Sequence, residues 1–445
     1  MSLNYVISIP SNFNTLSVTS APSPFQNNFT TPSATTALPS LASSISSLNF
    51  TAAWQENNRH LSRTFFEKVK LIMTIFWNAI ITVNLLPAST FDDASVKAIN
   101  LDFQRKWNTD SPDHQMLRKN FTPTPIEVTT PDGIKLSGTY FKNASAQETS
   151  PTVICFQPNA ALSKQGVFDW LLKQAALQEF PYNFVYFDYR GCGESNSIAC
   201  SQKDLFLDGE SIYQFVRDKL RVPENDIHFY GWSLGGGVSS NVKALHPECR
   251  GNYVNERSFN RIGNVLTNII PSLSSVASWI LSALNWNIDA AAAFEKLKGK
   301  TLVVRHPEDE MMRGRADLYQ SLIQRQLAPS TAITDLDLSL SPTRANSFHC
   351  NPLGTFAVED FNPEHAVSQF LFDSNTSFSA RILERFARGA RADFRNAVFE
   401  RIAREYQNGG RYWGSAEDAF YNRNGQTMTD AQRVEAIVTA KLQGL

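Results

Sequence analysis

Short, mainly apolar runs alternate with longer stretches of helical spacing through the middle of the chain. The apolar runs lie at residues 152–156, 183–187, 227–230 and 301–304. Stretches such as residues 166–177 and 204–220 separate them, and in these the apolar residues recur at helical spacing. Because apolar strands that alternate with helices are typical of α/β proteins, the pattern predicts a largely parallel sheet with helices on both faces, over about residues 122–372.

Two further strand-like runs come before these four. Residues 126–129 and 134–140 are separated by a short segment that contains the pair Asp132-Gly133. An Asp-Gly pair between alternating residues is a strong signal for a tight turn. The sequence therefore predicts a β-hairpin at the start of the sheet.

The N-terminal part of the chain has a different pattern. Residues 1–53 contain no charged residue and are dominated by Ser, Thr, Asn and Pro, which favours a disordered leader. Residues 54–121 are expected to form a helical extension, with an apolar run of about 16 residues at 71–86. A bilayer span needs about 20 mostly apolar residues, so this run favours a packed helix or one that contacts a membrane surface over a spanning helix.

The C-terminal part, residues 373–445, interleaves apolar residues and arginines near helical spacing. This pattern predicts an amphipathic helical extension. Its polar face either stays in solvent while the helix packs on the core, or it binds an anionic lipid or a protein partner.

Charge and composition narrow the function classes. The formal net charge is −1, which removes the electrostatic argument for a nucleic-acid-binding protein. The five cysteines are odd in number and lack a C-x-x-C spacing, which favours a reducing compartment such as the cytoplasm. The amino terminus has no basic region before an apolar run, so a Sec signal peptide is not expected.

His246 and Cys249 are too isolated for a zinc site, and no phosphate or dinucleotide motif occurs, so we expect neither a metal nor a cofactor.

The segment G-W-S-L-G at residues 231–235 carries the candidate chemistry. It follows the strand-like run 227–230 and precedes residues 238–245, which read as a helix. Ser233 is therefore expected on a sharp strand-to-helix turn, with glycines two residues away on either side to relieve crowding. This arrangement predicts a nucleophile elbow, the turn that carries the reactive serine in serine hydrolases.

Several segments in order resemble the α/β-hydrolase family. Residues 188–195, D-Y-R-G-C-G-E-S, resemble the turn D-x-R-G-x-G-x-S of that family, and N-E-R-S-F at residues 255–259 is similar to a segment of membrane-associated hydrolases that act on acyl lipids and acyl thioesters. The resemblance spans roughly residues 126–349. It implies an α/β-hydrolase fold with N- and C-terminal helical extensions, and a Ser-His-Asp triad in the chain order Ser, Asp, His.

This resemblance implies the acid and the base. Residues 303–312 resemble the strand and H-G-x-x-D turn that carry the acid in this family. The resemblance points to Asp309 as the acid, with Glu308 as the alternative. In this chain Pro307 stands in the turn, and the family glycine is missing. His349 lies about 40 residues after Asp309 and is the candidate base. His365 is the rival candidate. A near-neutral base must accept the serine proton, and a carboxylate must hold its imidazole tautomer.

The same resemblance implies an oxyanion hole from two backbone N–H groups. One belongs to Leu234, the residue after the nucleophile. The other would come from the loop at residues 157–161, where Asn159 is the best donor and Ala160 the next. Pro158 takes the place of the usual glycine, and proline has no N–H group to donate.

The expected function is hydrolysis of a carboxylic ester or thioester of a small-molecule or lipid acyl substrate. Apolar residues between 262 and 286 are expected beside the acyl pocket and favour an acyl substrate over a peptide. An alternative is a hydrolase fold with a weak or inactive site that serves as an interaction protein. The arrangement also resembles hydrolase-like proteins that intracellular bacteria deliver into host cells, which implies a cytoplasmic or host-delivered protein with possible membrane contact. The sequence leaves the oligomeric state open.

Overall fold

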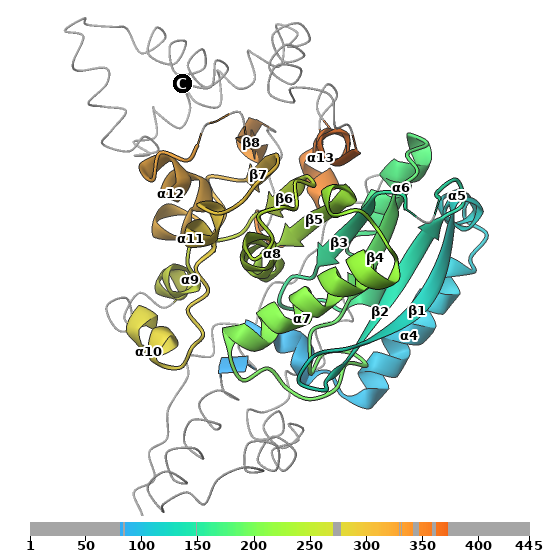
Figure 1. Ribbon diagram of the computed structural model, residues 1–445, viewed down its shortest axis with the longest axis horizontal. Coiled ribbons are helices and arrows are strands. Elements are labelled where there is room, and N and C mark those ends of the chain that lie inside the picture. The colour runs from blue at the N-terminus through green and yellow to red at the C-terminus, as the bar shows by residue number, and fades with distance from the viewer. Residues whose placement is uncertain are drawn as a thin grey trace, which may run out of the picture.

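The computed structural model describes residues 81–82, 85–147, 149–269, 277–328, 330, 332–340, 347–357 and 362–372 (Figure 1). The predicted leader at 1–53, most of the apolar run at 71–86 and the predicted C-terminal extension at 373–445 lie outside these residues. No helix in the described part of the chain is both long and apolar enough to cross a bilayer.

One sheet of eight strands runs through the described residues. The strands are β1 (Phe121–Thr129), β2 (Lys135–Asn143), β3 (Thr152–Phe156), β4 (Asn183–Phe187), β5 (Ile227–Trp232), β6 (Tyr253–Glu256), β7 (Thr301–Arg305) and β8 (Ile333–Asp337). Their order in the sheet is β1-β2-β4-β3-β5-β6-β7-β8. β1 and β2 form the predicted hairpin, β2 pairs with β4 antiparallel, and the other neighbours are parallel.

Helices cover both faces of this sheet. They are α4 (Asp93–Trp107), α5 (Pro112–Asn120), α6 (Asp169–Leu177), α7 (Gln202–Gln214), α8 (Leu234–Ala244), α9 (Ile262–Ile269), α10 (Ala277–Ala283), α11 (Ala290–Phe294), α12 (Leu318–Gln324) and α13 (Pro363–Phe372). In Figure 1, α7 and α8 lie on the face turned to the viewer. The predicted α/β-hydrolase fold, a mostly parallel sheet between two helical layers, is confirmed.

The alternation of side chains along the strands explains the two layers. In β3, Ile154 and Phe156 belong to a core cluster that also contains residues of α7, α8, α11 and α12. Val153 and Cys155 point the other way, into a second cluster with residues of α5, α6 and α13. Because successive strand residues face opposite sides, a strand that is apolar throughout must be covered on both.

The described residues before β1 are part of the same structure. Leu86, Ala88 and Val96 belong to the first core cluster, and Leu117 of α5 belongs to the second. The backbone N–H of Ala88, in the 3-10 turn η1 (Pro87–Thr90), donates to the carbonyl of Asn159. The end of the N-terminal extension therefore packs directly on the loop that follows β3.

The strand order sets the position of the site. The chain runs from β3 through α6 to β4 on one side of β3, and then through α7 to β5 on the other side. The carboxyl ends of parallel strands at such a reversal form the usual binding crevice of an open α/β sheet. β5, which leads to Ser233, ends at this position.

Candidate active site

Ser233 lies between β5 and α8, on the predicted strand-to-helix turn. Its backbone has a φ of 55° and a ψ of −117°, a conformation that costs energy for any residue with a side chain. The turn can close because its neighbours lack side chains: a Cβ on Gly235 would overlap the carbonyl of Phe156, and one on Gly231 would overlap the Ser239 hydroxyl. The turn places the Ser233 side chain at the carboxyl edge of the sheet.

The three side chains predicted for the triad meet in the structure. The Oγ of Ser233 lies 2.9 Å from Nε2 of His349, and Nδ1 of His349 lies 2.9 Å from Oδ2 of Asp309. The residues are buried, with exposed fractions of 4% for Ser233, 1% for Asp309 and 4% for His349. An imidazole with Nδ1–H bound to a carboxylate presents Nε2 as an acceptor, as proton removal from Ser233 requires.

The two alternatives from the sequence do not take part in this chain of contacts. Both ring nitrogens of His349 are occupied by Ser233 and Asp309. Glu308 directs its backbone N–H to the ring of His306, at 3.1 Å. His365 lies near the start of α13, where its backbone N–H donates to the Asn362 side chain.

Backbone groups hold the Asp309 carboxylate in place. The N–H groups of Met311 and Met312 each donate to Oδ1 at 2.9 Å. Burial raises the pKa of Asp309, but the hydrogen bond and charge of His349, with these two amides, outweigh burial and lower it. Asp309 is therefore a carboxylate at neutral pH. The turn closes without the family glycine, since the N–H of Asp309 donates to the carbonyl of His306.

The two predicted oxyanion donors lie on elements that pack together. Leu234 is the first residue of α8, where an N–H group has no acceptor inside the helix. The end of β3 and the start of the 157–161 loop lie against Gly235, in the same turn of α8. Asn159 is half-buried, and the Ala88 N–H fixes its carbonyl at 3.3 Å. The hydrogen bond from Ala88 could not be predicted from the sequence, because Ala88 is not part of any recognisable motif.

Asp188, the first residue of the D-x-R-G-x-G-x-S turn, binds Ser163, which comes shortly after that loop. Asp188 follows β4 and accepts hydrogen bonds from the backbone N–H of Ser163 at 2.6 Å and from its hydroxyl at 3.0 Å. Gly193, with a φ of 58°, closes over this carboxyl, and a Cβ there would press on Oδ2. Burial raises the pKa of Asp188 to about 7, against the lowering effect of Ser163 and Lys164.

Asp188→Asn is expected to become less destabilising as pH rises. The pKa of Asp188 rises from 3.8 to about 7 on folding, so its stabilising contribution is complete below 3.8 and is lost as pH rises through about 7. Asparagine does not titrate, so the difference in unfolding free energy between wild type and variant should shrink from about pH 5 to about pH 8. Urea unfolding at a series of pH values measures this difference.

Asp132→Asn is the matched control. Although burial raises the pKa of Asp132, its bonds to Arg190 and Thr130 lower it overall, so its titration lies below this window. The difference in unfolding free energy between wild type and Asp132→Asn should therefore stay constant between about pH 5 and about pH 8. A difference for Asp188→Asn that stays constant or grows with pH would contradict the prediction.

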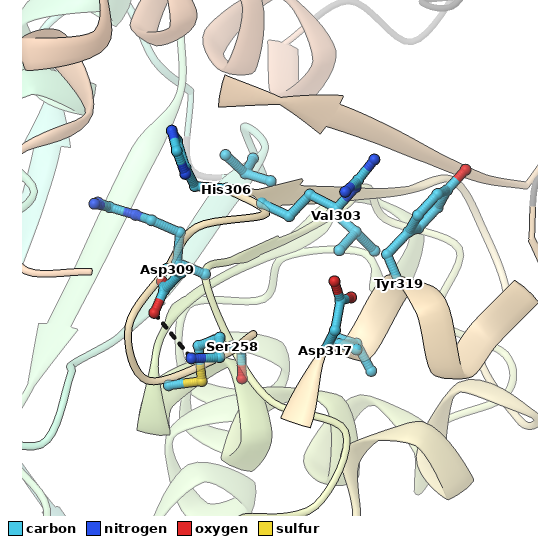
Figure 2. Close-up of a pocket in the computed structure, with 11 residues that line it drawn as sticks. Ser258, Val303, His306, Asp309, Asp317 and Tyr319 are labelled. Atoms are coloured by element: carbon cyan, nitrogen blue, oxygen red, sulfur yellow. Dashed lines mark hydrogen bonds between the residues drawn. The ribbon is translucent and has the colours of Figure 1, made fainter. Parts of the chain in front are cut away.

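A pocket lies beside the acid, and Figure 2 shows His306 and Asp309 on its wall together with Asp317 and Tyr319. The Arg305 guanidinium, also on this wall, pairs with Asp335 and with Asp337 on β8. Burial raises the pKa of Asp317. Among the described residues, no group of three or more His, Cys, Asp and Glu side chains is arranged to hold a metal ion.

Comparison with known proteins finds partial similarity to two relatives. It is 31% identical over 121 residues to the uncharacterized protein R595 of Acanthamoeba polyphaga mimivirus, which is 26% of this chain and 38% of that protein. It is 31% identical over 182 residues to the uncharacterized protein YfhR of Salmonella typhi, which is 38% of this chain and 59% of that protein. The chain thus spans less than two thirds of the length of these two relatives.

An esterase of Pyrococcus furiosus is similar in backbone, with a TM-score of 0.43, 17% identity, and coverage of 57% of this chain and 92% of the esterase. The family model described as Chlamydia CHLPS protein (DUF818) matches residues 154–380, just over half of the 445 residues. This match contains the G-W-S-L-G elbow, the D-x-R-G turn and the segments that carry Asp309 and His349. The chain belongs to the Chlamydia CHLPS protein (DUF818) family.

Proposed function

We propose that this protein is a serine hydrolase that cleaves a carboxylic ester or thioester of an acyl substrate through an acyl-enzyme. The observation that carries the proposal is the continuous contact from the Ser233 hydroxyl through the His349 ring to the Asp309 carboxylate, at 2.9 Å in each step. A serine hydroxyl is a weak nucleophile unless a positioned base accepts its proton. His349 is positioned to be that base, and the Asp309 carboxylate orients its ring.

In the first half of the reaction, Oγ of Ser233 bonds to the substrate carbonyl carbon while Nε2 of His349 accepts the hydroxyl proton. The negative charge that develops on the carbonyl oxygen is stabilised by the N–H groups of Leu234 and Asn159. The bond from carbon to the leaving oxygen or sulfur then breaks. His349 gives its proton to that leaving group, and the acyl group stays on Ser233.

In the second half, a water molecule replaces the leaving group. His349 accepts a proton from the water as its oxygen bonds to the acyl carbon, and the Ser233–acyl bond breaks. The proton returns to Oγ of Ser233 and the carboxylic acid departs. Asp309 remains ionised throughout and stabilises the imidazolium form of His349.

The segment between the nucleophile and the acid is rich in apolar residues, which favours an apolar acyl group as the substrate. Val265 of α9 and Leu281 of α10 belong to the first core cluster. Side-chain amides fix α9 to the loop after the acid: Asn264 donates to the carbonyl of Arg315 at 3.0 Å, and Asn268 donates to that of Arg313 at 2.8 Å. An apolar helix is therefore held beside the acid loop.

Labelling with an alkyl fluorophosphonate tests this function. The wild-type chain is expected to take up the label on Ser233, because the probe reacts with a serine hydroxyl only when a base activates it. Ser233→Ala should lose the label completely while keeping its fold by circular dichroism. Ser368→Ala is the matched control, because Ser368 is also buried but lies on α13, where its hydroxyl donates to the carbonyl of His365, and this variant should retain the label.

The same experiment separates the two function classes. A folded wild-type protein that takes up no label would reject the serine-hydrolase proposal. It would favour the alternative, a hydrolase fold that serves as an interaction protein.

A further inference from the structure

The segment Asn255–Ser258, part of N-E-R-S-F, contacts the elements that carry all three residues of the triad. The backbone N–H of Ser233 donates to the carbonyl of Glu256 at 2.9 Å. The hydroxyl of Ser258 donates to the carbonyl of Ser233 at 2.7 Å. Both backbone polar groups of the nucleophile are therefore bound, one by the last residue of β6 and the other by Ser258 just after β6, which fixes the strained turn.

Arg257, between these two residues, joins the nucleophile to the acid strand. Its backbone N–H donates to the carbonyl of Val304 on β7, at 2.7 Å. Arg257 has a φ of 41°, in the left-handed region that residues with a side chain rarely adopt. Such a conformation persists only when surrounding contacts determine it.

The Arg257 side chain turns back toward the loop of the base. Nη1 donates to the carbonyl of Phe348 at 2.8 Å and to the carbonyl of Asn351 at 2.6 Å. These two carbonyls lie on either side of His349. Arg257 is 2% exposed, so its guanidinium is largely removed from water.

The charge of this buried guanidinium is compensated locally. Nε donates to Oε1 of Glu256 at 3.0 Å, and Nη2 contacts the same oxygen. The other carboxylate oxygen of Glu256 accepts the Tyr230 hydroxyl. The guanidinium also lies 4.9 Å from the centre of the Trp232 ring, next to the nucleophile. A buried arginine is tolerated when it is paired and its donors are used, and here both conditions are met.

A second charged residue, Glu310, also binds the base loop. The carboxylate of Glu310, directly after the acid, accepts the backbone N–H of Phe348 at 3.1 Å and that of His349 at 3.4 Å, as well as the Ser347 hydroxyl. Arg257 thus binds carbonyls of this loop while Glu310 binds its N–H groups.

We propose that Arg257 is a positioning residue for His349: its guanidinium binds the two carbonyls that flank the base and so sets the distance from Nε2 to the Ser233 hydroxyl. This inference rests on the proposed hydrolase function. The guanidinium has donors enough for Glu256 and both loop carbonyls at once, in a planar arrangement. A lysine ammonium has three donors on one atom and cannot reproduce that geometry.

Arg257→Lys is expected to lower kcat for a p-nitrophenyl ester by roughly 10- to 100-fold, with KM little changed, because a small misplacement of a catalytic group acts on the chemical step. The neutral pair Glu256→Gln/Arg257→Met should have the same effect without leaving a buried charge unpaired. In both variants, the ring N–H proton that His349 donates to Asp309 should lose its downfield NMR signal, which is assigned with His349→Gln.

Arg190→Lys is the matched control. Arg190 is likewise buried and pairs with Asp208 at 2.8 Å and with Asp132 at 2.8 Å, but none of these residues contacts the triad or the base loop. Arg190→Lys should lower the melting temperature, while kcat and the NMR signal of His349 stay unchanged. This comparison separates a positioning role from a general contribution to stability.

The outcomes distinguish this inference from the function on which it rests. If folded Arg257→Lys and the neutral pair keep both kcat and the His349 signal, Arg257 is not a positioning residue, whatever the wild type hydrolyses. If wild type fails to react with the fluorophosphonate, the function is rejected, and the NMR signal alone still decides whether Arg257 positions His349. Loss of the signal in Arg190→Lys as well would overturn the inference.

Discussion

Replacement of His349 by alanine is expected to lower kcat for an activated ester by roughly 10⁶-fold, the scale on which triad bases act. Nε2 of His349 lies 2.9 Å from the Ser233 hydroxyl, and without it no group accepts the proton during attack. The residues of a triad act as a unit, so the double variant Ser233→Ala/His349→Ala should be no slower than either single variant. Initial rates on a p-nitrophenyl ester measure all three.

His365→Ala is the control for this prediction. His365 is the rival base from the sequence. It lies on α13, whereas His349 contacts both the Ser233 hydroxyl and the Asp309 carboxylate. Its loss should change kcat only slightly. A large loss of kcat in His365→Ala, with His349→Ala nearly as fast as wild type, would assign the base to His365.

Asp309→Asn is expected to lower kcat by roughly 10⁴-fold with little change in shape, as substitution of a triad acid by its amide does. An amide at this position can donate to Nδ1 of His349, which places the ring proton on Nε2 and removes the acceptor that Ser233 needs. The effect follows from the tautomer, so KM should change far less than kcat. Steady-state kinetics at neutral pH, where the lowered pKa keeps wild-type Asp309 ionised, measures it.

Glu308→Gln provides the matched comparison. Glu308 is the neighbouring carboxylate and was the alternative acid, yet the Nδ1 partner of His349 is Asp309. Its substitution should leave kcat within a few-fold of wild type. Equal losses in Asp309→Asn and Glu308→Gln would show that the negative charge of the turn matters, and that the single contact to Nδ1 does not.

The sequence alone determined the alternation of strands and helices, because a strand buried on both faces must be mainly apolar. β3, β4 and β7 were predicted in this way. β6 and β8 were missed, since their polar residues interrupt that pattern. β6 carries the buried Asn255 and Glu256, and β8 carries Asp335 and Asp337, which pair with Arg305.

The elbow at Ser233 was also readable from the sequence, because a strand, a turn and a helix lie within a few residues of one another. Local spacing and glycines at 231 and 235 are enough to predict it. The choice between Asp309 and Glu308, and between His349 and His365, was not local. Adjacent residues on a turn point in different directions, and only the packed loops decide which carboxylate and which ring meet.

The contacts around that triad were decided by the tertiary structure. N-E-R-S-F was recognisable as a segment similar to one in other hydrolases, but nothing in its sequence indicates that Arg257 binds the carbonyls of Phe348 and Asn351. These residues are more than ninety positions apart, and they meet because parallel strands bring their following loops to the same edge of the sheet. Sequence patterns record what each segment must bury, whereas the meeting of distant loops depends on the order in which the strands assemble.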